Sequence, residues 1–184
     1  MSVDEFRQHV LTEAGPTHAA AVEAMYPLSD YPSPFDAWAA VLTDASMSCP
    51  AKESIVLLST RDNREASTRG NASTAAQATP KYLYHFVHQI DLITALNLTN
   101  ALGVFHGSEL PFVFNKYEIL VQKERALASK VVGWWDSLAA SGVPTEEWPP
   151  YSVPNNLSLR IDYVPEVEAG LKEKVCEFWK TIPR

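Results

Sequence analysis

The sequence predicts part of an α/β layer fold, rich in helices and short of strands. Apolar residues recur at three- and four-residue spacing over much of the chain, as they do on one face of a helix. Only two segments, Lys81 to His88 and Asn156 to Val164, have the composition or the alternation of strands. Two strands would leave unpaired edges and would not cover the apolar helix faces, so we expect them to belong to a larger sheet.

The first part of the chain is predicted to be helical. Residues 3–14 and 17–26 form two short helices separated by Gly15-Pro16, and after a proline-rich loop Asp36 is a plausible N-cap. The helical pattern from Ala37 to Thr60 is interrupted at Cys49-Pro50, where two helices are expected to meet.

The second part begins with a polar segment, residues 61–80, which is rich in Ser, Thr, Asn and Ala and is expected to form a surface loop. The strand at Lys81 follows. A long helix is predicted from about Lys116 to Ser141, ended by Gly142. After the second strand, Val167 to Thr181 reads as a closing amphipathic helix.

Composition narrows the class of protein. The chain has 184 residues, of which 46% are hydrophobic and 20% charged, and its net charge of −7 comes without a dense basic cluster. The sequence therefore lacks the basic patch that is typical of nucleic-acid-binding proteins. No apolar run approaches the roughly 18 residues of a membrane span. The first ten residues, MSVDEFRQHV, lack the apolar core of a signal peptide.

Two features are typical of an oxidising compartment. The sequons at Asn71, Asn97 and Asn156 are candidate glycosylation sites, although such tripeptides often arise by chance. The two cysteines, Cys49 and Cys176, are far apart in sequence, and the residues alone leave open whether they are buried thiols or a disulfide.

Two other groups have a structural explanation that outweighs a functional one. His85 and His88 are spaced for chelation on a helix, but on a strand positions three apart face opposite sides, so no metal site is expected. The pair Trp134-Trp135 lies on the apolar face of the long predicted helix, where core packing is the better explanation.

The stretch LGVFHGSELPFVF, residues 102–114, carries the candidate chemistry, because it holds one histidine between glycines and beside a carboxylate. It resembles the histidine loop of type B carboxylesterases, the cholinesterase-like branch of the α/β-hydrolases. Other segments resemble this family in the same order along the chain: TDASMSCP, KYLYHFVH, ERALASKVVGWWDSLAASGVPTEEWPPY and LKEKVCEFW.

This resemblance implies roles for individual residues. His106 corresponds to the general base of a Ser-His-Glu/Asp triad, and Gly107 lets its loop bend. Glu109 corresponds to the acidic residue after the histidine, a supporting group and not the triad acid. Cys49 and Cys176 correspond to a disulfide-forming pair, whose closure would stabilise the fold by on the order of 4 kcal/mol. Asp44 corresponds to a structural position near the first cysteine.

The rest of the triad has no match here. No Gly-x-Ser-x-Gly nucleophile elbow occurs, and in this family the serine, the acid and the oxyanion loop all precede the histidine. The resemblance therefore implies that residues 1–184 are the C-terminal segment of an incomplete carboxylesterase type B domain, with the last strands of its central sheet.

The expected function is that of an ester hydrolase fragment that supplies the catalytic histidine and is inactive alone. The alternatives are a non-catalytic binding or adhesion module, or a degenerate remnant. We expect a small carboxylic ester as substrate of the completed enzyme, no cofactor, no metal and no nucleic acid. A homodimer through the C-terminal helices and a secretory location of the full-length form are further expectations.

Overall fold

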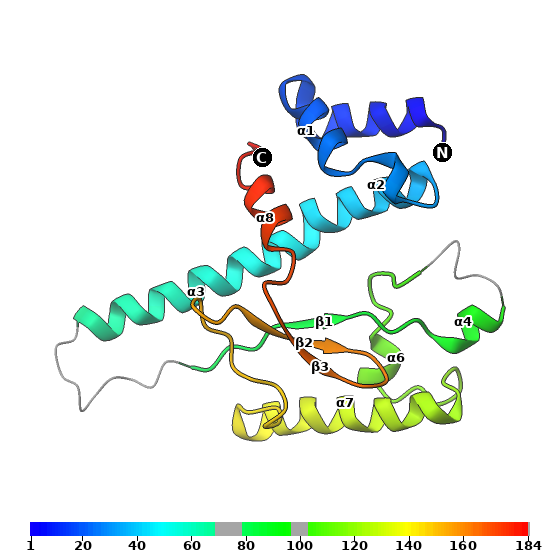
Figure 1. Ribbon diagram of the computed structural model, residues 1–184. Helices are drawn as coiled ribbons and strands as arrows, with labels where there is room; N and C mark the ends of the chain where they lie inside the picture. Colours follow the sequence, from blue (N-terminus) through cyan, green and yellow to red (C-terminus); the bar gives the residue numbers. More distant parts are fainter. Residues whose placement is uncertain (69–78, 97–102, 184) are drawn as a thin grey trace. The chain divides into compact units, whose positions relative to one another are not determined.

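The computed structural model describes residues 1–68, 79–96 and 103–183 (Figure 1). The chain divides into two compact units. Unit 1 combines Met1–Leu57 with Lys172–Arg184, and unit 2 consists of Leu58–Leu171. Each unit has its own hydrophobic core.

Unit 1 begins with helix α1, Val3–Met25. Ser2 caps it, because its hydroxyl accepts the Glu5 N–H while the Glu5 carboxylate accepts the Ser2 N–H. Gly15, with φ 72° and ψ 167°, interrupts the helix, which confirms the predicted break. The first core residues of the unit, Phe6, Val10, Ala14 and Val22, lie on this helix.

The next helices of unit 1 differ from the prediction at their ends. After a short 3₁₀ turn η1, Leu28–Asp30, helix α2 spans Pro34–Thr43. Its N-cap is Ser33 and not Asp36, because proline at the first helical position leaves the serine hydroxyl to accept the Asp36 N–H at 3.3 Å.

Helix α3, Cys49–Thr68, follows a π-helical turn η2 at Asp44–Ser48. The predicted break at Cys49-Pro50 is thus a change of helix type, with proline in the first turn of α3. The expected loop at residues 61–80 is wrong for 61–68, which continue α3, since Ser, Thr and Asn disfavour a helix only weakly. Residues 69–78 lie outside the described part of the chain.

Unit 2 contains a three-stranded sheet in the order β1-β2-β3. Strands β1, Tyr84–Phe86, and β2, Leu157–Ile161, are parallel, and His85 pairs with Arg160. Strand β3, Glu166–Ala169, is antiparallel to β2. The expected closing helix from Val167 is therefore wrong in its first part.

The cause of this error is a short alternating pattern that precedes two left-handed residues. Glu166 to Ala169 alternates charged and apolar side chains, the period of a strand. Gly170, with φ 71°, and Lys172, with φ 49°, then turn the chain. Helix α8 starts only at Glu173 and ends at Trp179.

The described residues of unit 2 that follow β1 also form helices. They are α4, Asp91–Ala95; α6, Leu110–Val113; and α7, Gln122–Ser141. The long helix starts later than its predicted residue 116 and ends as predicted at Gly142, which is left-handed with φ 77°. Figure 1 shows α7 running along the sheet.

The core of unit 2 joins α7 and α6 to the sheet. Its buried members include Phe112 of α6, Leu127 and Trp134 of α7, and Leu159 of β2. Trp135 packs against this core from the same helix, so core packing explains both tryptophans. The described residues thus form a helix-rich α/β arrangement with a small mixed sheet. Among their helices, none has the length and apolar character to cross a bilayer.

Candidate functional site

His106 lies in a tight turn that precedes helix α6. The Ser108 N–H donates to the Phe105 carbonyl at 3.0 Å, and the Leu110 N–H donates to the Gly107 carbonyl at 3.1 Å. Gly107 has φ 86°, a conformation that residues with a Cβ rarely adopt. The sequence therefore forms this turn because glycine follows the histidine.

The His106 side chain is exposed, and no residue in the described part of the chain hydrogen-bonds to its ring. The turn is nevertheless anchored, because Ser108 and Phe112 on its C-terminal side are 2% and 0% exposed. A free ring on an anchored turn can present a nitrogen to a group from outside the described residues. This arrangement suits a general base, which must reach the proton that it abstracts.

Large apolar side chains surround this turn and remain exposed. Phe105 is 39% exposed, Leu110 48% and Phe114 67%. Contiguous exposed apolar side chains are typical of a surface that another part of a protein covers. The first strand is open as well: among the described strands, β1 pairs with β2 alone.

Glu109, the expected supporting acid, lies at the start of α6. Its backbone carbonyl accepts the Phe112 and Val113 N–H groups, so its main chain fixes the helix. Neither a hydrogen bond nor an ion pair joins it to His106 within the described residues. Burial raises the pKa of Tyr84, and the charge of Glu109 raises it further, which places this carboxylate near β1.

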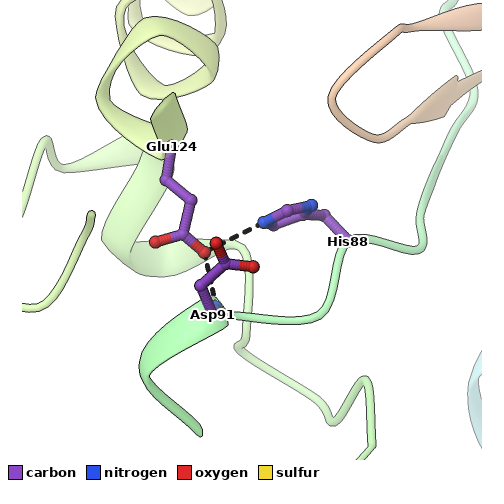
Figure 2. Close-up of side chains that lie close together, drawn as sticks. All are labelled: His88, Asp91 and Glu124. Carbon is purple, nitrogen blue, oxygen red and sulfur yellow. Dashed lines mark hydrogen bonds and ion pairs between the residues drawn. The ribbon is translucent and has the colours of Figure 1, made fainter. Parts of the chain in front are cut away.

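A second cluster in unit 2 lies around His88 (Figure 2). The ring Nδ1 lies 2.9 Å from Asp162 Oδ1, and Nε2 lies 3.0 Å from Glu124 Oε1. The side chains of His88 and Glu124 are 2% and 0% exposed. Glu124 Oε1 also accepts the Asp91 N–H at 2.6 Å, and its Oε2 accepts the Val121 N–H at 2.9 Å.

Positive and hydroxyl groups stabilise the other two carboxylates of this cluster. Burial raises the pKa of Asp162, but hydrogen bonds from His88 and from the Tyr163 N–H outweigh burial and leave that pKa below its usual value. The pKa of Asp91 is also lowered: burial raises it, and hydrogen bonds from Lys123 and the Tyr163 hydroxyl outweigh that effect.

His88, Asp91 and Glu124 each offer one ligand atom within 4.8 Å of the others, which is close enough to hold a metal ion. The carboxylate oxygens of Asp91 and Glu124, however, already accept hydrogen bonds. Two backbone N–H groups point at Glu124, and the Lys123 ammonium lies 2.9 Å from Asp91. A cation would face these positive groups, so the donor set fits a hydrogen-bonded charge network better than a metal centre.

His85 has a separate partner from His88. Its Nδ1 lies 3.0 Å from Glu168 Oε1, which also accepts the Ser158 hydroxyl at 3.2 Å. This contact links β1, β2 and β3 through their side chains. The two histidines of the His-x-x-His pattern are thus each engaged with carboxylates and do not share a partner.

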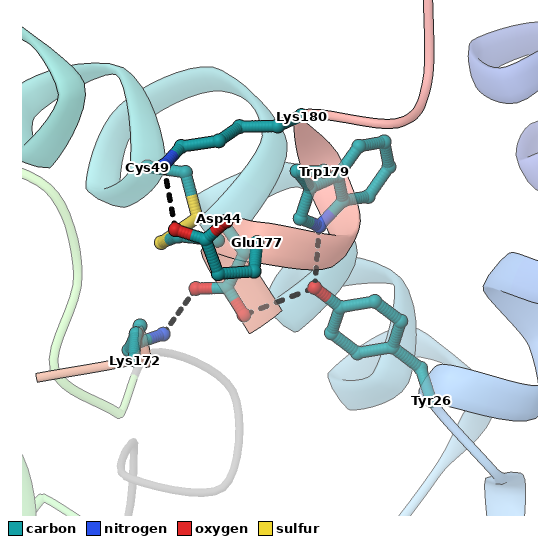
Figure 3. The surroundings of a disulfide bond; sticks show 8 residues. Tyr26, Asp44, Cys49, Lys172, Glu177, Trp179 and Lys180 are labelled. Atoms are coloured by element: carbon teal, nitrogen blue, oxygen red, sulfur yellow. Dashed lines mark hydrogen bonds and ion pairs between the residues drawn. A yellow bond between two sulfur atoms is a disulfide. The ribbon is translucent and has the colours of Figure 1, made fainter. Parts of the chain in front are cut away.

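The disulfide that the resemblance implied is present: Cys49 and Cys176 are joined with a Cα–Cα distance of 5.1 Å (Figure 3). It links the start of α3 to α8 within unit 1. Next to it, buried Asp44 pairs with Lys172 and accepts the Tyr26 hydroxyl at 3.1 Å. Burial raises the pKa of Tyr26, and Asp44 raises it further, so this hydroxyl is a stable donor. Asp44 therefore has a structural role in unit 1.

The candidate glycosylation sites fall into two groups. Asn71 and Asn97 lie outside the described residues. Asn156 stands immediately before β2 with φ 47°, and its side-chain oxygen is buried without a hydrogen-bond partner. Ser158 of the same sequon is 0% exposed. This folded geometry does not favour a glycan on Asn156.

The His88 cluster was missed as a unit by sequence reasoning, which tested His88 only as a metal ligand. One signal was available. Glu124 is an acidic residue three positions after Val121, at the start of the long helix, and such a residue can accept the N-cap N–H. Its contact with His88, 36 positions away in sequence, has no counterpart in local pattern.

Comparison with known proteins assigns the family. The model of the carboxylesterase family matches residues 5–179. The chain is 29% identical over 114 residues to the pyrethroid hydrolase Ces2e of Rattus norvegicus, covering 57% of this chain and 20% of that protein. It is 28% identical over 121 residues to the acetylcholinesterase of Danio rerio, covering 56% and 18%.

The chain therefore belongs to the carboxylesterase family, which confirms the resemblance read from its motifs. It is also 27% identical over 114 residues to the acylcarnitine hydrolase of Rattus norvegicus, again covering 57% of this chain and 20% of the relative. The chain thus spans about a fifth of the length of these curated relatives.

Proposed function

We propose that residues 1–184 act as the C-terminal segment of a carboxylesterase domain and supply His106 as its general base. The exposed, unpartnered ring of His106 on an anchored glycine turn, inside the segment that matches the family, is the observation that carries this proposal. The names of the relatives, a pyrethroid hydrolase and an acylcarnitine hydrolase, support ester hydrolysis as the reaction class.

In the completed site, the His106 imidazole takes the proton from a serine hydroxyl as its oxygen attacks the carbonyl carbon of a carboxylic ester. The imidazolium then gives this proton to the departing alcohol, and a water molecule repeats the sequence to release the acid. The serine, the triad acid and the oxyanion donors come from the remainder of the domain. They supply most of the transition-state stabilisation, so the chain alone is inactive.

The remainder of the domain covers two open features of unit 2. One is the free edge of β1, which can pair with a further strand and so extend the small sheet into the larger one. The other is the exposed apolar group Phe105, Leu110 and Phe114 around the histidine. The substrate is a small carboxylic ester. The disulfide supports a secretory location for the full-length form, and a homodimer through the C-terminal helices stays a prediction.

A chimeric enzyme tests this proposal. The matching C-terminal part of the rat pyrethroid hydrolase Ces2e is replaced by this chain, and hydrolysis of a nitrophenyl ester is measured. Formation of the Cys49–Cys176 disulfide serves as the check of folding. His106→Ala should lower kcat/KM by at least about 10⁴-fold, while His18→Ala, a partly buried histidine of unit 1, should leave it unchanged.

Full activity of the His106→Ala chimera would exclude the general-base role. The separate chain of 184 residues should not hydrolyse the same ester above the rate in buffer. Turnover by that chain, abolished by His106→Ala, would show that a nucleophile lies within it and would contradict the division of the site.

A further inference from the structure

The His88 ring is held between carboxylates at both of its nitrogens. A neutral imidazole carries one N–H and one lone pair, so one nitrogen would face a carboxylate oxygen with no proton between them. Yet the two contacts, to Asp162 and Glu124, measure 2.9 and 3.0 Å, both within normal hydrogen-bond range. Either the ring holds both protons, or one carboxylate holds the second.

The charges around the ring favour the doubly protonated form. The groups that face it or its partners are three carboxylates and two cations: Asp91, Asp162, Glu124, Lys123 and Arg160. The lowered pKa values of Asp91 and Asp162 mean that these carboxyls are ionised at neutral pH. A neutral His88 would leave this set of groups with a net negative charge beside the buried Glu124 carboxylate, whereas an imidazolium balances it.

The remaining neighbours of the ring carry no charge at neutral pH. Tyr163 lies edge-on with ring centroids 4.4 Å apart, and its raised pKa of about 12 keeps its hydroxyl protonated. Phe86 and Phe112 pack against the ring at 6.3 and 5.3 Å. These apolar contacts exclude water and strengthen the ionic hydrogen bonds.

The same cluster closes a loop. The Glu124 carboxylate accepts hydrogen bonds from the His88 ring and the Asp91 N–H, which precede one segment of the chain. It also accepts one from the Val121 N–H, which follows that segment. The described residues between these two points, 92–96 and 103–120, include the turn with His106. One carboxylate therefore binds backbone groups on both sides of the part of the chain that carries the proposed general base.

Phe112 provides the link from the cluster to the turn. It is 0% exposed and its ring meets that of His88. Its N–H donates to the carbonyl of Glu109 at 2.9 Å, three residues after His106. One packed side chain therefore connects the His88 ring to the base of the turn.

We propose that His88 is a positioning residue, held as an imidazolium between Glu124 and Asp162, that closes the base of the segment carrying His106. Its relevance to catalysis rests on the proposed function, but the protonation state and the closure do not. Glu124→Gln removes the negative charge that retains the second ring proton, and it replaces one of the two acceptor oxygens by an amide nitrogen, which cannot accept a backbone N–H.

Nitrogen-15 NMR of the histidine rings in the full chain at neutral pH, where a free imidazole is mostly neutral, is the first test. His88, identified by the signal lost in His88→Asn, should show protons on both Nδ1 and Nε2. In Glu124→Gln the Nε2 proton should be lost, and in Glu118→Gln, an exposed residue of the same segment, both should remain. A wild-type ring with a bare nitrogen would overturn the proposal.

Hydrogen exchange tests the closure independently of any enzymatic activity. The amides of Ser108, Leu110 and Phe112 should exchange at least about tenfold faster in Glu124→Gln than in wild type or Glu118→Gln. Equal rates would overturn the positioning role. If Glu124→Gln does not fold, Asp162→Asn, at a 32% exposed carboxylate, provides the same two readouts with smaller expected changes.

These measurements separate the two proposals. A His106→Ala chimera that stays active would refute the proposed function, and it would not bear on the ring protons or the exchange rates. A neutral His88 ring, or hydrogen exchange that Glu124→Gln does not alter, would refute the positioning role of His88 and would not bear on the role of His106.

Discussion

The two units of the molecule use different interactions to join segments that are far apart in sequence. In unit 1 a disulfide joins residues 127 positions apart, and the ion pair of Asp44 and Lys172 lies beside it. In unit 2, where no cysteine is present, the comparable long-range closure is the contact of His88 with Glu124 and Asp162. One closure depends on oxidation of two thiols, and the other depends on hydrogen bonds between a histidine ring and carboxylates that must stay ionised.

This difference follows from what each unit has to hold. Unit 1 brings together the two ends of the chain, and a covalent link limits the many conformations that such distant segments have when unfolded. Unit 2 holds an internal segment with the candidate base. A buried ionic network fixes geometry more than it adds stability, because desolvation offsets much of its attraction. We therefore expect the two units to respond to different perturbations.

Removal of the disulfide should give the largest effect and should fall on unit 1. In the Cys49→Ala/Cys176→Ala variant, the free energy of unfolding of unit 1 should decrease by about 4 kcal/mol, because the unfolded chain regains the freedom of the open loop. Hydrogen exchange resolved by segment measures this, with α2 and α8 expected to lose protection and α7 to keep most of it.

The exposed Ser54→Ala on α3 is the matched control and should leave both units unchanged. An equal loss of protection in α7 would show that the disulfide supports both units, and the two units would then not respond to different perturbations.

The sequence predicted the parts of the fold that local pattern determines. The break at Gly15, the end of α7 at Gly142 and the strand within residues 81–88 all follow from residues close together in the chain. The errors have local causes too. Strand β3 is only four residues long and was absorbed into the helix that follows it.

The pairing of Cys49 with Cys176 was predictable because the family resemblance supplied both positions. The role of His106 comes from the same resemblance and stays a prediction. The cluster around His88 was not predictable, because its carboxylates come from the residue after β2, from α7 and from the start of α4, and meet only in the folded unit. Long-range charge contacts of this kind leave no periodic signal in a sequence.

Acid should weaken unit 2 by a smaller amount than removal of the disulfide weakens unit 1. Asp91 and Asp162 have folded-state pKa values below their usual range, whereas an aspartate in an unfolded chain has a pKa of about 3.9. The folded unit therefore binds fewer protons than the unfolded chain around this pH. Its stability from these groups is present above about pH 4 and is lost as the pH falls through the lower folded values.

Chemical denaturation between pH 6 and 3, followed by the fluorescence of tryptophans in the unit 2 core, measures this loss. Asp162→Asn should lower stability at pH 6 and flatten the decline toward pH 3, because one of the two depressed carboxyls is gone. An unchanged slope in this variant would show that Asp162 does not contribute to the acid dependence.

The smallest effect concerns the turn itself. Gly107→Ala should cost unit 2 about 1 kcal/mol, because alanine is strained at a left-handed φ of 86°. Space is not the obstacle: an added Cβ would meet the Leu110 side chain at 3.5 Å, an ordinary contact. Gly133→Ala in α7 is the matched control, since nothing lies within 4 Å of its added Cβ and alanine favours a helix by about 1 kcal/mol. Denaturant unfolding should therefore give changes of opposite sign for the two variants. If Gly107→Ala were neutral, the turn that presents His106 would not depend on its glycine, and the anchored geometry inferred for the base would lose its local cause.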